Sequence, residues 1–410
     1  MSFGLLGQHL SHSLSPLLHQ EIGGYPYHLY EIEPQRLQNF FMRREFDGIN
    51  VTIPYKKMCL PYCDLLTPIA RQLGNVNLIR RLPDGRLLGD NTDITGFTRL
   101  LSDFPLSAAG KKVLILGTGG AGTTAEQVLC SQGAKTVMIS RTGRDHYQNL
   151  DRHADARLIV NATPVGMYPK LGCAPLSLSH FPHLEGVIDL IYNPLQTMLL
   201  FEARERALAT VNGLPMLVGQ ALTAIELFGG KPLPADAFTR GMALCRRTLC
   251  NLLLIGMPGC GKTSVGRLLA KRLDLPFADC DEVFEKSFGQ SPADFLAQHT
   301  EADFREKEAA ILDELTQTGG KVIATGGGAV CTAAGRRALS QNGFVVYLTR
   351  PAEELECSGR PLSNSPGALQ RLYRQRAGYY EAFSDLKLPC ADSAEKTAKN
   401  LQKELLSCGF

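Results

Sequence analysis

The sequence predicts an α/β protein in which strands and helices alternate around parallel sheets. Two stretches support this prediction, because each is an apolar strand that runs into a glycine-rich turn and then into a helix. Val113–Leu116 precedes the turn at residues 117–122, and Leu252–Ile255 precedes the turn at residues 256–263. The glycine spacing differs between the turns, and only the second contains lysine. We therefore expect two different nucleotide-binding domains rather than an internal repeat.

The length of 410 residues predicts two to four domains, since chains longer than about 250 to 300 residues usually divide. Residues 1–100 are too long for a loop and form a separate lobe, on which residues 216–247 are expected to pack back. Residues 101–215 are assigned to a Rossmann domain. Residues 248–410 are assigned to a P-loop α/β domain of the nucleoside-monophosphate-kinase type.

Shorter patterns locate individual elements. Strands are expected at Phe3–Leu6 and Ile49–Ile53, and a hairpin is expected around the turn Pro83-Asp84-Gly85. Helices are expected at Met216–Phe228 and Ala235–Arg247.

Composition excludes several classes of protein. Hydrophobic residues make up 44% and charged residues 20% of the chain, which is ordinary globular usage. The net charge of +3 is too small to predict nucleic-acid binding. No apolar run approaches the roughly 18 to 20 residues of a membrane span, and residues 1–16 do not resemble a signal peptide. We expect a cytoplasmic protein with no membrane or nucleic-acid partner, whose 12 scattered cysteines are reduced.

The first turn has the spacing G-x-G-x-x-G at Gly117, Gly119 and Gly122. After a strand and before a helix, this spacing predicts a dinucleotide site. The first glycine makes the turn, the second lets pyrophosphate approach the backbone, and the helix N-terminus supplies N–H donors.

The next predicted strand, Thr136–Ile139, ends at a basic segment. An NAD enzyme usually has an acidic residue there for the ribose 2′-hydroxyl, whereas this chain has Ser140-Arg141-Thr142-Gly143-Arg144. Two guanidinium groups and two hydroxyls suit a 2′-phosphate, which favours NADP over NAD. The alternative is a pair of solvated surface arginines.

Polar clusters in the first region predict a site for a small hydroxylated molecule, since they offer short neutral donors and acceptors. They are His12-Ser13-Leu14-Ser15-Pro16, Asn50-Val51-Thr52-Ile53-Pro54-Tyr55-Lys56 and Asn91-Thr92-Asp93. Lys56 and Asp93, if adjacent, can hold and relay a proton. Taken alone, each cluster also fits a structural role, with the serines as helix caps and Lys56 as a surface charge.

Together, the motifs of residues 1–245 resemble those of the shikimate dehydrogenases. Beside the three clusters and the glycine turn, the resemblance includes Gly96-Phe97, Asn161-Ala162-Thr163-Pro164-Val165-Gly166-Met167, Asp189-Leu190-Ile191-Tyr192-Asn193-Pro194 and Met216-Leu217-Val218-Gly219-Gln220. The chain departs from the family pattern at Leu78, where a hydroxyl residue is usual after Asn77, and at Ser140, where asparagine is usual.

The resemblance implies the reduction of 3-dehydroshikimate by NADPH, with Lys56 and Asp93 as the catalytic pair. The implied substrate-binding residues are Ser13, Ser15, Thr52, Asn77, Asp93, Tyr192 and Gln220. The implied NADP(H)-binding residues are Gly117, Gly119, Gly120, Gly122, Ser140, Arg141, Thr142 and Arg144.

The second turn is a complete P-loop, because lysine and a hydroxyl follow its glycines. Its backbone is expected to cradle phosphates, while Lys262 neutralises the outer ones and Thr263 binds Mg²⁺. Asp279 and Asp281 follow the next short strand, 276–278. One carboxylate can reach the magnesium shell, and the other can face an acceptor hydroxyl.

Further motifs resemble those of the shikimate kinases over residues 251–410: Phe304-Arg305, Glu308, Thr325-Gly326-Gly327-Gly328, Arg360-Pro361-Leu362 and Arg376. Individually these arginines are more typical of surface salt bridges. The resemblance implies that shikimate binds Asp281, Arg305, Gly327, Gly328 and Arg376. It implies that ATP and Mg²⁺ bind Gly259, Gly261, Lys262, Thr263 and Asp279, and that Asp281, Lys262 and Arg360 take part in phosphoryl transfer.

The two resemblances support each other, because the product of the first implied reaction is the substrate of the second. The sequence therefore predicts a bifunctional enzyme that makes shikimate and phosphorylates it. Two alternatives stay open, namely a dehydrogenase that also or preferentially acts on quinate, and a non-catalytic sensor of these metabolites. The oligomeric state is left open.

Overall fold

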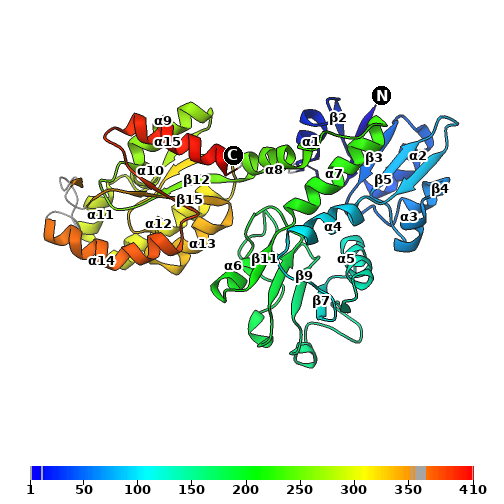
Figure 1. Ribbon diagram of the computed structural model, residues 1–410, viewed down its shortest axis with the longest axis horizontal. Coiled ribbons are helices and arrows are strands. Elements are labelled where there is room, and N and C mark those ends of the chain that lie inside the picture. Colours follow the sequence, from blue (N-terminus) through cyan, green and yellow to red (C-terminus); the bar gives the residue numbers. More distant parts are fainter. Residues whose placement is uncertain (1, 11–12, 352–353, 356–365, 409) are drawn as a thin grey trace. The chain divides into compact units, whose positions relative to one another are not determined.

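The computed structural model describes residues 2–10, 13–351, 354–355, 366–408 and 410. The chain forms two compact units, Met1–Tyr192 with Thr197–Cys245 and Asn193–Gln196 with Arg246–Phe410. Both units are built from sheets and helices (Figure 1), which confirms the predicted α/β class. The finer division at residues 1–100, 101–215 and 248–410 stays a prediction.

The first sheet of the first unit is mixed, in the order β2-β1-β3-β5-β6-β4. Strand β1 runs parallel to β2 and β3, and β5 and β6 form the predicted antiparallel hairpin. The strands are β1 (Phe3–Gly7), β2 (Tyr27–Glu31), β3 (Gly48–Val51), β4 (Leu65–Leu66), β5 (Leu78–Arg81) and β6 (Leu87–Asp90). The helical segments beside it are α1 (Ser15–Glu21), η1 (Pro34–Arg36), α2 (Leu37–Arg43), η2 (Leu60–Tyr62) and α3 (Pro68–Leu73).

The expected strand Ile49–Ile53 was placed too far along the chain, since β3 ends at Val51. The backbone turns at Thr52, whose carbonyl oxygen accepts a hydrogen bond from the Tyr55 N–H at 2.8 Å. Ile53 consequently leaves the sheet and is exposed. The residues after β3 therefore form a turn rather than a strand.

The second sheet of the first unit is parallel, in the order β11-β10-β9-β7-β8. Its strands are β7 (Lys112–Leu116), β8 (Lys135–Ile139), β9 (Leu158–Asn161), β10 (Gly186–Asp189) and β11 (Ala209–Val211). The accompanying helical segments are α4 (Asp93–Asp103), α5 (Gly120–Ser131), η3 (Leu150–His153), η4 (Leu178–His180), α6 (Met198–Glu205) and α7 (Leu214–Gly229). Between β8 and β9 the chain makes only the short turn η3 where a crossover helix is usual.

Helices α4 and α7 pack at very short range. A Cβ atom built on Gly96 would lie 2.5 Å from the carbonyl oxygen of Met216, and one built on Gly219 would lie 3.1 Å from the Cα of Gly96. The two glycines therefore let the helix backbones approach each other. This packing fixes the start of α4, which carries Asp93, against the helix that carries Gln220.

The second unit has one parallel sheet in the order β13-β14-β12-β15-β16. Its strands are β12 (Asn251–Ile255), β13 (Phe277–Asp279), β14 (Val322–Ala324), β15 (Gly343–Thr349) and β16 (Leu386–Pro389). The helical segments of this unit are α9 (Lys262–Leu273), α10 (Cys280–Phe288), α11 (Pro292–Gln298), α12 (Glu301–Thr316), η5 (Ala329–Cys331), α13 (Ala333–Gln341), α14 (Pro366–Ala382) and α15 (Ala394–Ser407). Helix α8 (Ala237–Leu249) runs from the first unit into the second.

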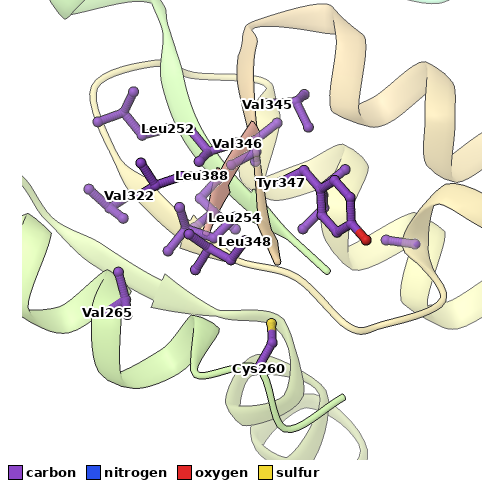
Figure 2. Packing of buried hydrophobic residues seen from close by; sticks show 14 of the residues in the cluster. Leu252, Leu254, Cys260, Val265, Val322, Val345, Val346, Tyr347, Leu348 and Leu388 are labelled. Atoms are coloured by element: carbon purple, nitrogen blue, oxygen red, sulfur yellow. The ribbon is translucent and has the colours of Figure 1, made fainter. Parts of the chain in front are cut away.

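The core of the second unit surrounds its central strands (Figure 2). Leu252 and Leu254 on β12 and Val346 and Leu348 on β15 are buried, and Val265 reaches them from α9. A parallel strand with both faces covered is expected to be apolar throughout, as β12 and β15 largely are. None of the helices formed by the described residues is long and apolar enough to cross a membrane.

We predict that Gly96→Ala destabilises the first unit by about 1 to 3 kcal/mol, the usual cost of overpacking. The added methyl group would meet the rigid backbone of α7 rather than a flexible side chain. Gly229→Ala is the matched control, because a Cβ there meets nothing within 4 Å. Urea unfolding followed by circular dichroism measures both changes, and equal stability of the two variants would contradict the prediction.

A second prediction concerns His19, which is buried on α1 and stacks on Tyr27 with ring centroids 3.9 Å apart. Burial lowers the pKa of His19 from 6.5 to about 3. Between these pH values the unfolded chain binds the proton and the folded chain does not, so stability falls as the pH falls. His19 alone contributes about 1.4 kcal/mol per pH unit to this dependence.

Urea unfolding from pH 7 to pH 4 tests this slope. The slope of His19→Phe should differ from that of wild type by about this amount, whereas the slope of His28→Phe, at an exposed position of β2, should match wild type. A wild-type slope that survives in His19→Phe would show that another group causes the acid sensitivity.

Candidate active sites

The ion pair of Lys56 and Asp93 joins two strand ends of the first unit. Lys56 lies in the turn after β3, and Asp93 is the first residue of α4 after β6. The distance from Nζ to Oδ2 is 2.5 Å, and the two side chains are 18% and 6% exposed. Asn77 donates from Nδ2 to the other carboxylate oxygen at 2.8 Å. Both oxygens of Asp93 are therefore bound, which fixes the position of the lysine ammonium group.

A network of buried amides surrounds this pair. Asn91 donates to Asn75 Oδ1 at 2.7 Å, and the side-chain oxygen of Asn91 accepts the N–H of Asp93 at 2.9 Å. Asn50 accepts the hydroxyl of Tyr27 at 2.7 Å. The sequence placed Asn50 and Asn91 in the polar clusters without giving either an individual role, and it gave no role to Asn75 or Tyr27. A visible signal is that Asn50 lies within a predicted strand and that Asn75 and Asn91 flank the predicted hairpin, where a buried amide must find partners.

The remaining residues predicted for the first substrate lie on neighbouring elements. Ser13 follows β1 and accepts the N–H of Ser15 at 3.2 Å, and Ser15 is buried at the start of α1. Thr52 follows β3, the parallel neighbour of β1. Gln220 lies on α7, where its Nε2 donates to the Leu217 carbonyl at 2.9 Å. Ser13 and Thr52 thus follow the carboxyl ends of adjacent strands, while their contact with a substrate stays a prediction.

The first glycine turn brings β7 and α5 into close contact. Gly117 has φ of +100°, a conformation that favours glycine. A Cβ on Gly122 would overlap the carbonyl oxygen of Gly117. Gly119 has open space where its side chain would be, and α5 begins at Gly120. The turn therefore presents the N-terminus of α5 at an open backbone surface, as an anion site requires.

Gly120 also lies against the ion pair. A Cβ built on Gly120 would lie 3.3 Å from Cδ of Lys56 and 3.5 Å from Oδ1 of Asn75. Asn75 in turn donates to Thr123 on α5 at 3.4 Å. The first unit thus brings together the glycine turn and the lysine that the sequence predicted from separate motifs.

The basic segment after β8 is exposed. Ser140 donates a short hydrogen bond to the Thr142 carbonyl, while the side chains of Arg141 and Arg144 face solvent. Neither guanidinium forms an ion pair with any residue that the structure describes. Oδ1 of Asp145 lies 3.0 Å from Nε2 of His153. Asn149 donates a hydrogen bond to the Arg144 carbonyl oxygen at 2.9 Å. The segment is anchored through its backbone, which leaves both arginines available to an anion.

The segment after β10 contains Tyr192, which is half-buried. Burial raises the pKa of Tyr192 to about 12. Asp189, at the end of β10, accepts from Thr197 at 2.6 Å and from Asn161 at 3.0 Å. Burial raises the pKa of Asp189 to about 6, against the opposing effect of these hydrogen bonds. Asp189 therefore organises the loop, and the predicted contact of Tyr192 with substrate is not tested by these distances.

In the second unit, the P-loop connects β12 to α9. Gly256, Gly259 and Gly261 all have positive φ. Lys262 is buried, and its Nζ donates to the carbonyl oxygens of Gly256 and Met257 at 3.0 and 3.1 Å. The ammonium group of Lys262 thus lies inside the loop, in the place where phosphate oxygens are expected to bind.

Thr263 and Asp279 lie directly beside the loop. The hydroxyl of Thr263 donates to Asp279 Oδ2 at 2.7 Å. The other oxygen of Asp279 caps α10 by accepting the N–H of Asp281 at 2.9 Å. A hydroxyl and a carboxylate at this spacing are ligands that suit Mg²⁺ beside bound phosphates.

Buried Arg376 and largely buried Arg305 meet the glycines after β14. Arg376 on α14 donates to the Gly327 carbonyl at 3.0 Å. A Cβ on Gly328 would overlap the guanidinium group of Arg305, and one on Gly327 would lie 2.9 Å from Pro258 of the P-loop. A side chain at either glycine would force Arg305 or Pro258 to shift. The structure therefore brings the glycines, the arginines and the P-loop together, as the motifs suggested.

Arg305 is held by two carboxylates of its own helix. Its Nη1 lies 2.7 Å from Glu308 Oε2, and its Nη2 lies 3.0 Å from Glu301 Oε1. Burial lowers the pKa of Arg305, but the two carboxylates raise it by more. The sequence prediction quoted Glu308 without a role and missed Glu301; the i, i+3 and i, i+4 spacing on a predicted helix could have identified both. Arg360, also predicted, lies outside the described residues.

The residues present fit the groups that they were predicted to bind. A dinucleotide fits the first unit because Gly119 offers open backbone, and because Arg141 and Arg144 are exposed and form no ion pair with the described residues. ATP with Mg²⁺ fits the second because a buried lysine lies among P-loop carbonyls beside a hydroxyl and carboxylate pair. These folds and sites define a chain of two nucleotide-dependent enzymes, one of the Rossmann class and one of the P-loop class.

Comparison with known proteins agrees with this division. Residues 5–79 match the family model described as the shikimate dehydrogenase substrate binding domain, and residues 258–406 match the model described as shikimate kinase. A shikimate dehydrogenase (NADP⁺) from Methanopyrus kandleri is 34% identical over 267 residues, which cover 57% of this chain and 91% of that protein.

Solved structures give the same result for the first unit. Shikimate 5-dehydrogenase from Thermus thermophilus, in complex with NADP(H) and shikimate, is 32% identical with a TM-score of 0.54, covering 60% of this chain and 99% of that chain. Quinate dehydrogenase from Corynebacterium glutamicum, in complex with NAD, is 28% identical with a TM-score of 0.53, covering 60% and 98%. This chain belongs to the shikimate dehydrogenase family and continues into a shikimate kinase region.

Proposed function

We propose that the first unit reduces 3-dehydroshikimate to shikimate with NADPH and that the second unit phosphorylates shikimate with ATP and Mg²⁺. The observation that supports this most strongly is the contact of Gly120 with Lys56, because it joins a dinucleotide turn to a proton donor. Matches to both family models support the pairing of the two activities in one chain.

In the proposed reduction, Lys56 donates a proton to the oxygen that becomes a hydroxyl. NADPH, when bound, supplies the hydride. Asp93 keeps the ammonium group in place, and Asn77 keeps the carboxylate in place through its 2.8 Å hydrogen bond. Positioning of this kind accounts for much of the rate gain in reactions of two bound partners. Ser13, Ser15, Thr52, Tyr192 and Gln220 are proposed to bind the substrate.

In the proposed phosphorylation, Lys262 neutralises charge on the transferred phosphoryl group, and Thr263 with Asp279 holds Mg²⁺. Asp281 orients the acceptor hydroxyl and accepts its proton. Arg305, Arg376 and the backbone of Gly327 and Gly328 bind shikimate, with the two arginines facing its carboxylate. Arg360 is proposed to assist transfer on the basis of its motif alone.

Two alternatives differ from this proposal. A quinate dehydrogenase is the first, and Arg141 with Arg144 argues against an NAD-dependent form of it. A metabolite sensor is the second, and the intact Lys56–Asp93 and Thr263–Asp279 pairs argue against it. We further propose a cytoplasmic location with 3-dehydroshikimate and shikimate as small-molecule partners.

The decisive experiment supplies purified protein with 3-dehydroshikimate, NADPH, ATP and Mg²⁺ and identifies the products by mass spectrometry. Shikimate 3-phosphate is the expected product. Faster turnover of quinate with NAD would favour the first alternative. Binding of shikimate without either turnover would favour the second.

We predict that Lys56→Ala and Lys262→Ala each abolish one activity and spare the other. The rate of the affected reaction should fall by about 100- to 10,000-fold, which is the usual contribution of a positioned proton donor or phosphate-binding charge. Separate assays of NADPH oxidation and of ADP release measure the two activities. Loss of both activities in either variant would contradict the assignment of these residues to separate sites.

We also predict that Arg141→Ala and Arg144→Ala raise the KM for NADPH by about 10-fold each and leave the KM for NADH nearly unchanged. The reason is that each removes a charge-assisted hydrogen bond to the 2′-phosphate only. Arg152→Ala is the matched control, because Arg152 is an exposed arginine a short distance along the same segment. Equal effects on NADPH and NADH would show that these arginines do not distinguish the nucleotides.

A further inference from the structure

The contacts of Glu301 lead to one further inference, which rests on the proposed function of the second unit. Glu301 is the first residue of α12. Its Oε1 lies 3.0 Å from Nη2 of Arg305 and 4.0 Å from Nη2 of Arg376. These guanidinium groups come from α12 and α14, and both are about nine-tenths buried. One carboxylate oxygen thus bridges the two cations that are proposed to bind the carboxylate of shikimate.

The four described side chains that these ion pairs join balance one another in charge. Arg305 and Arg376 contribute two positive charges, and Glu301 and Glu308 contribute two negative charges. A substrate carboxylate added to this set would leave an excess negative charge in a partly buried place, where unbalanced charge is costly. One carboxylate therefore has to leave when the substrate enters.

The exposure of the two glutamates decides which one leaves. The Glu308 side chain is 6% exposed and lies 2.7 Å from Arg305 Nη1. Its other oxygen, Oε1, packs so closely against Gly326 that a Cβ atom built on this glycine would overlap it. The backbone at Gly326 therefore restricts movement of the Glu308 side chain. The Glu301 side chain is 54% exposed and can turn into water without losing hydration. Glu308 stays as the permanent counter-ion of one arginine, and Glu301 is the exchangeable one.

We propose that Glu301 is a specificity-determining residue that competes with the carboxylate of shikimate for Arg305 and Arg376. A molecule binds only if its own anionic group replaces Glu301 at both guanidinium groups. Neutral cyclic polyols cannot displace the glutamate and are excluded, while carboxylates of the right shape are admitted. The cost of displacing Glu301 appears as a weaker apparent affinity for shikimate.

The test compares wild-type protein with Glu301→Gln in steady-state phosphorylation of shikimate at saturating ATP and Mg²⁺. Glutamine removes the competing charge and keeps the size of the side chain. The KM for shikimate should fall about two- to fivefold, as expected for loss of one partly exposed ion pair, with kcat changed by less than about twofold. Methyl shikimate, used as substrate or as competing inhibitor, has no carboxylate charge. The Glu301→Gln substitution should therefore raise the affinity for methyl shikimate much less than the affinity for shikimate.

Glu306→Gln is the matched control, because Glu306 is an exposed glutamate on the same helix and has no ion pair among the described residues. It should leave the KM for shikimate unchanged. A KM that is unchanged or raised in Glu301→Gln would overturn the inference. If the KM values for shikimate and for its methyl ester rose alike in Glu301→Gln, Glu301 would only position Arg305.

Failure of the proposed function gives a different result. If the wild-type protein releases no ADP with shikimate, the kinase proposal fails, and calorimetric titration with shikimate then tests Glu301 alone. Tighter binding by Glu301→Gln than by wild type would support the inference even then. Equal or weaker binding by Glu301→Gln, or no binding by either protein, would reject it.

Discussion

Close contact between backbone atoms at a strand end is the constraint on which both units depend. In each unit a glycine-rich turn joins a buried parallel strand to a helix, and the backbone can approach so closely there only where no side chain intervenes. Gly122 meets Gly117 in the first unit, and Gly256 meets the backbone of Leu348 in the second. Both turns direct helical N–H groups toward the strand ends, where the polar residues of neighbouring strands also gather.

The two units hold positive charge in different ways. Arg141 and Arg144 are exposed and free of ion pairs within the described chain, so a bound anion would be partly hydrated and sensitive to salt. Arg305 and Arg376 are buried beside carboxylates, so an anion there must replace an existing partner. The first arrangement favours ready exchange of a large nucleotide. The second favours discrimination between small molecules of similar shape.

Much of the fold could be predicted because glycine turns, apolar strands and a proline-aspartate-glycine hairpin are local signals. Lys56 and Asp93 were selected from motifs 37 residues apart and lie in one ion pair. The predicted end of β3 was wrong, because apolar Ile53 continues the strand pattern of the sequence although the backbone turns at Thr52. Such a turn depends on Tyr55 and on packing that the local pattern does not contain.

The site was less predictable where partners come from distant elements. Asn75 bonds to Asn91 and to Thr123, and no spacing rule relates these three positions. The contact of Glu301 with Arg376 crosses from α12 to α14 for the same reason. Burial creates these contacts, because a polar group removed from water must take whichever partner the fold provides.

Helix α8 joins the units without an intervening loop. One residue, Cys250, separates its end at Leu249 from the start of β12 at Asn251. The Cys250 N–H bonds to the Arg246 carbonyl, and its own carbonyl accepts the Gly320 N–H. A protease needs several residues of unpaired, extended chain to cut, and this junction offers none. Cleavage here would first require the end of α8 to unwind. We therefore expect that a protease does not cut the folded protein between α8 and β12.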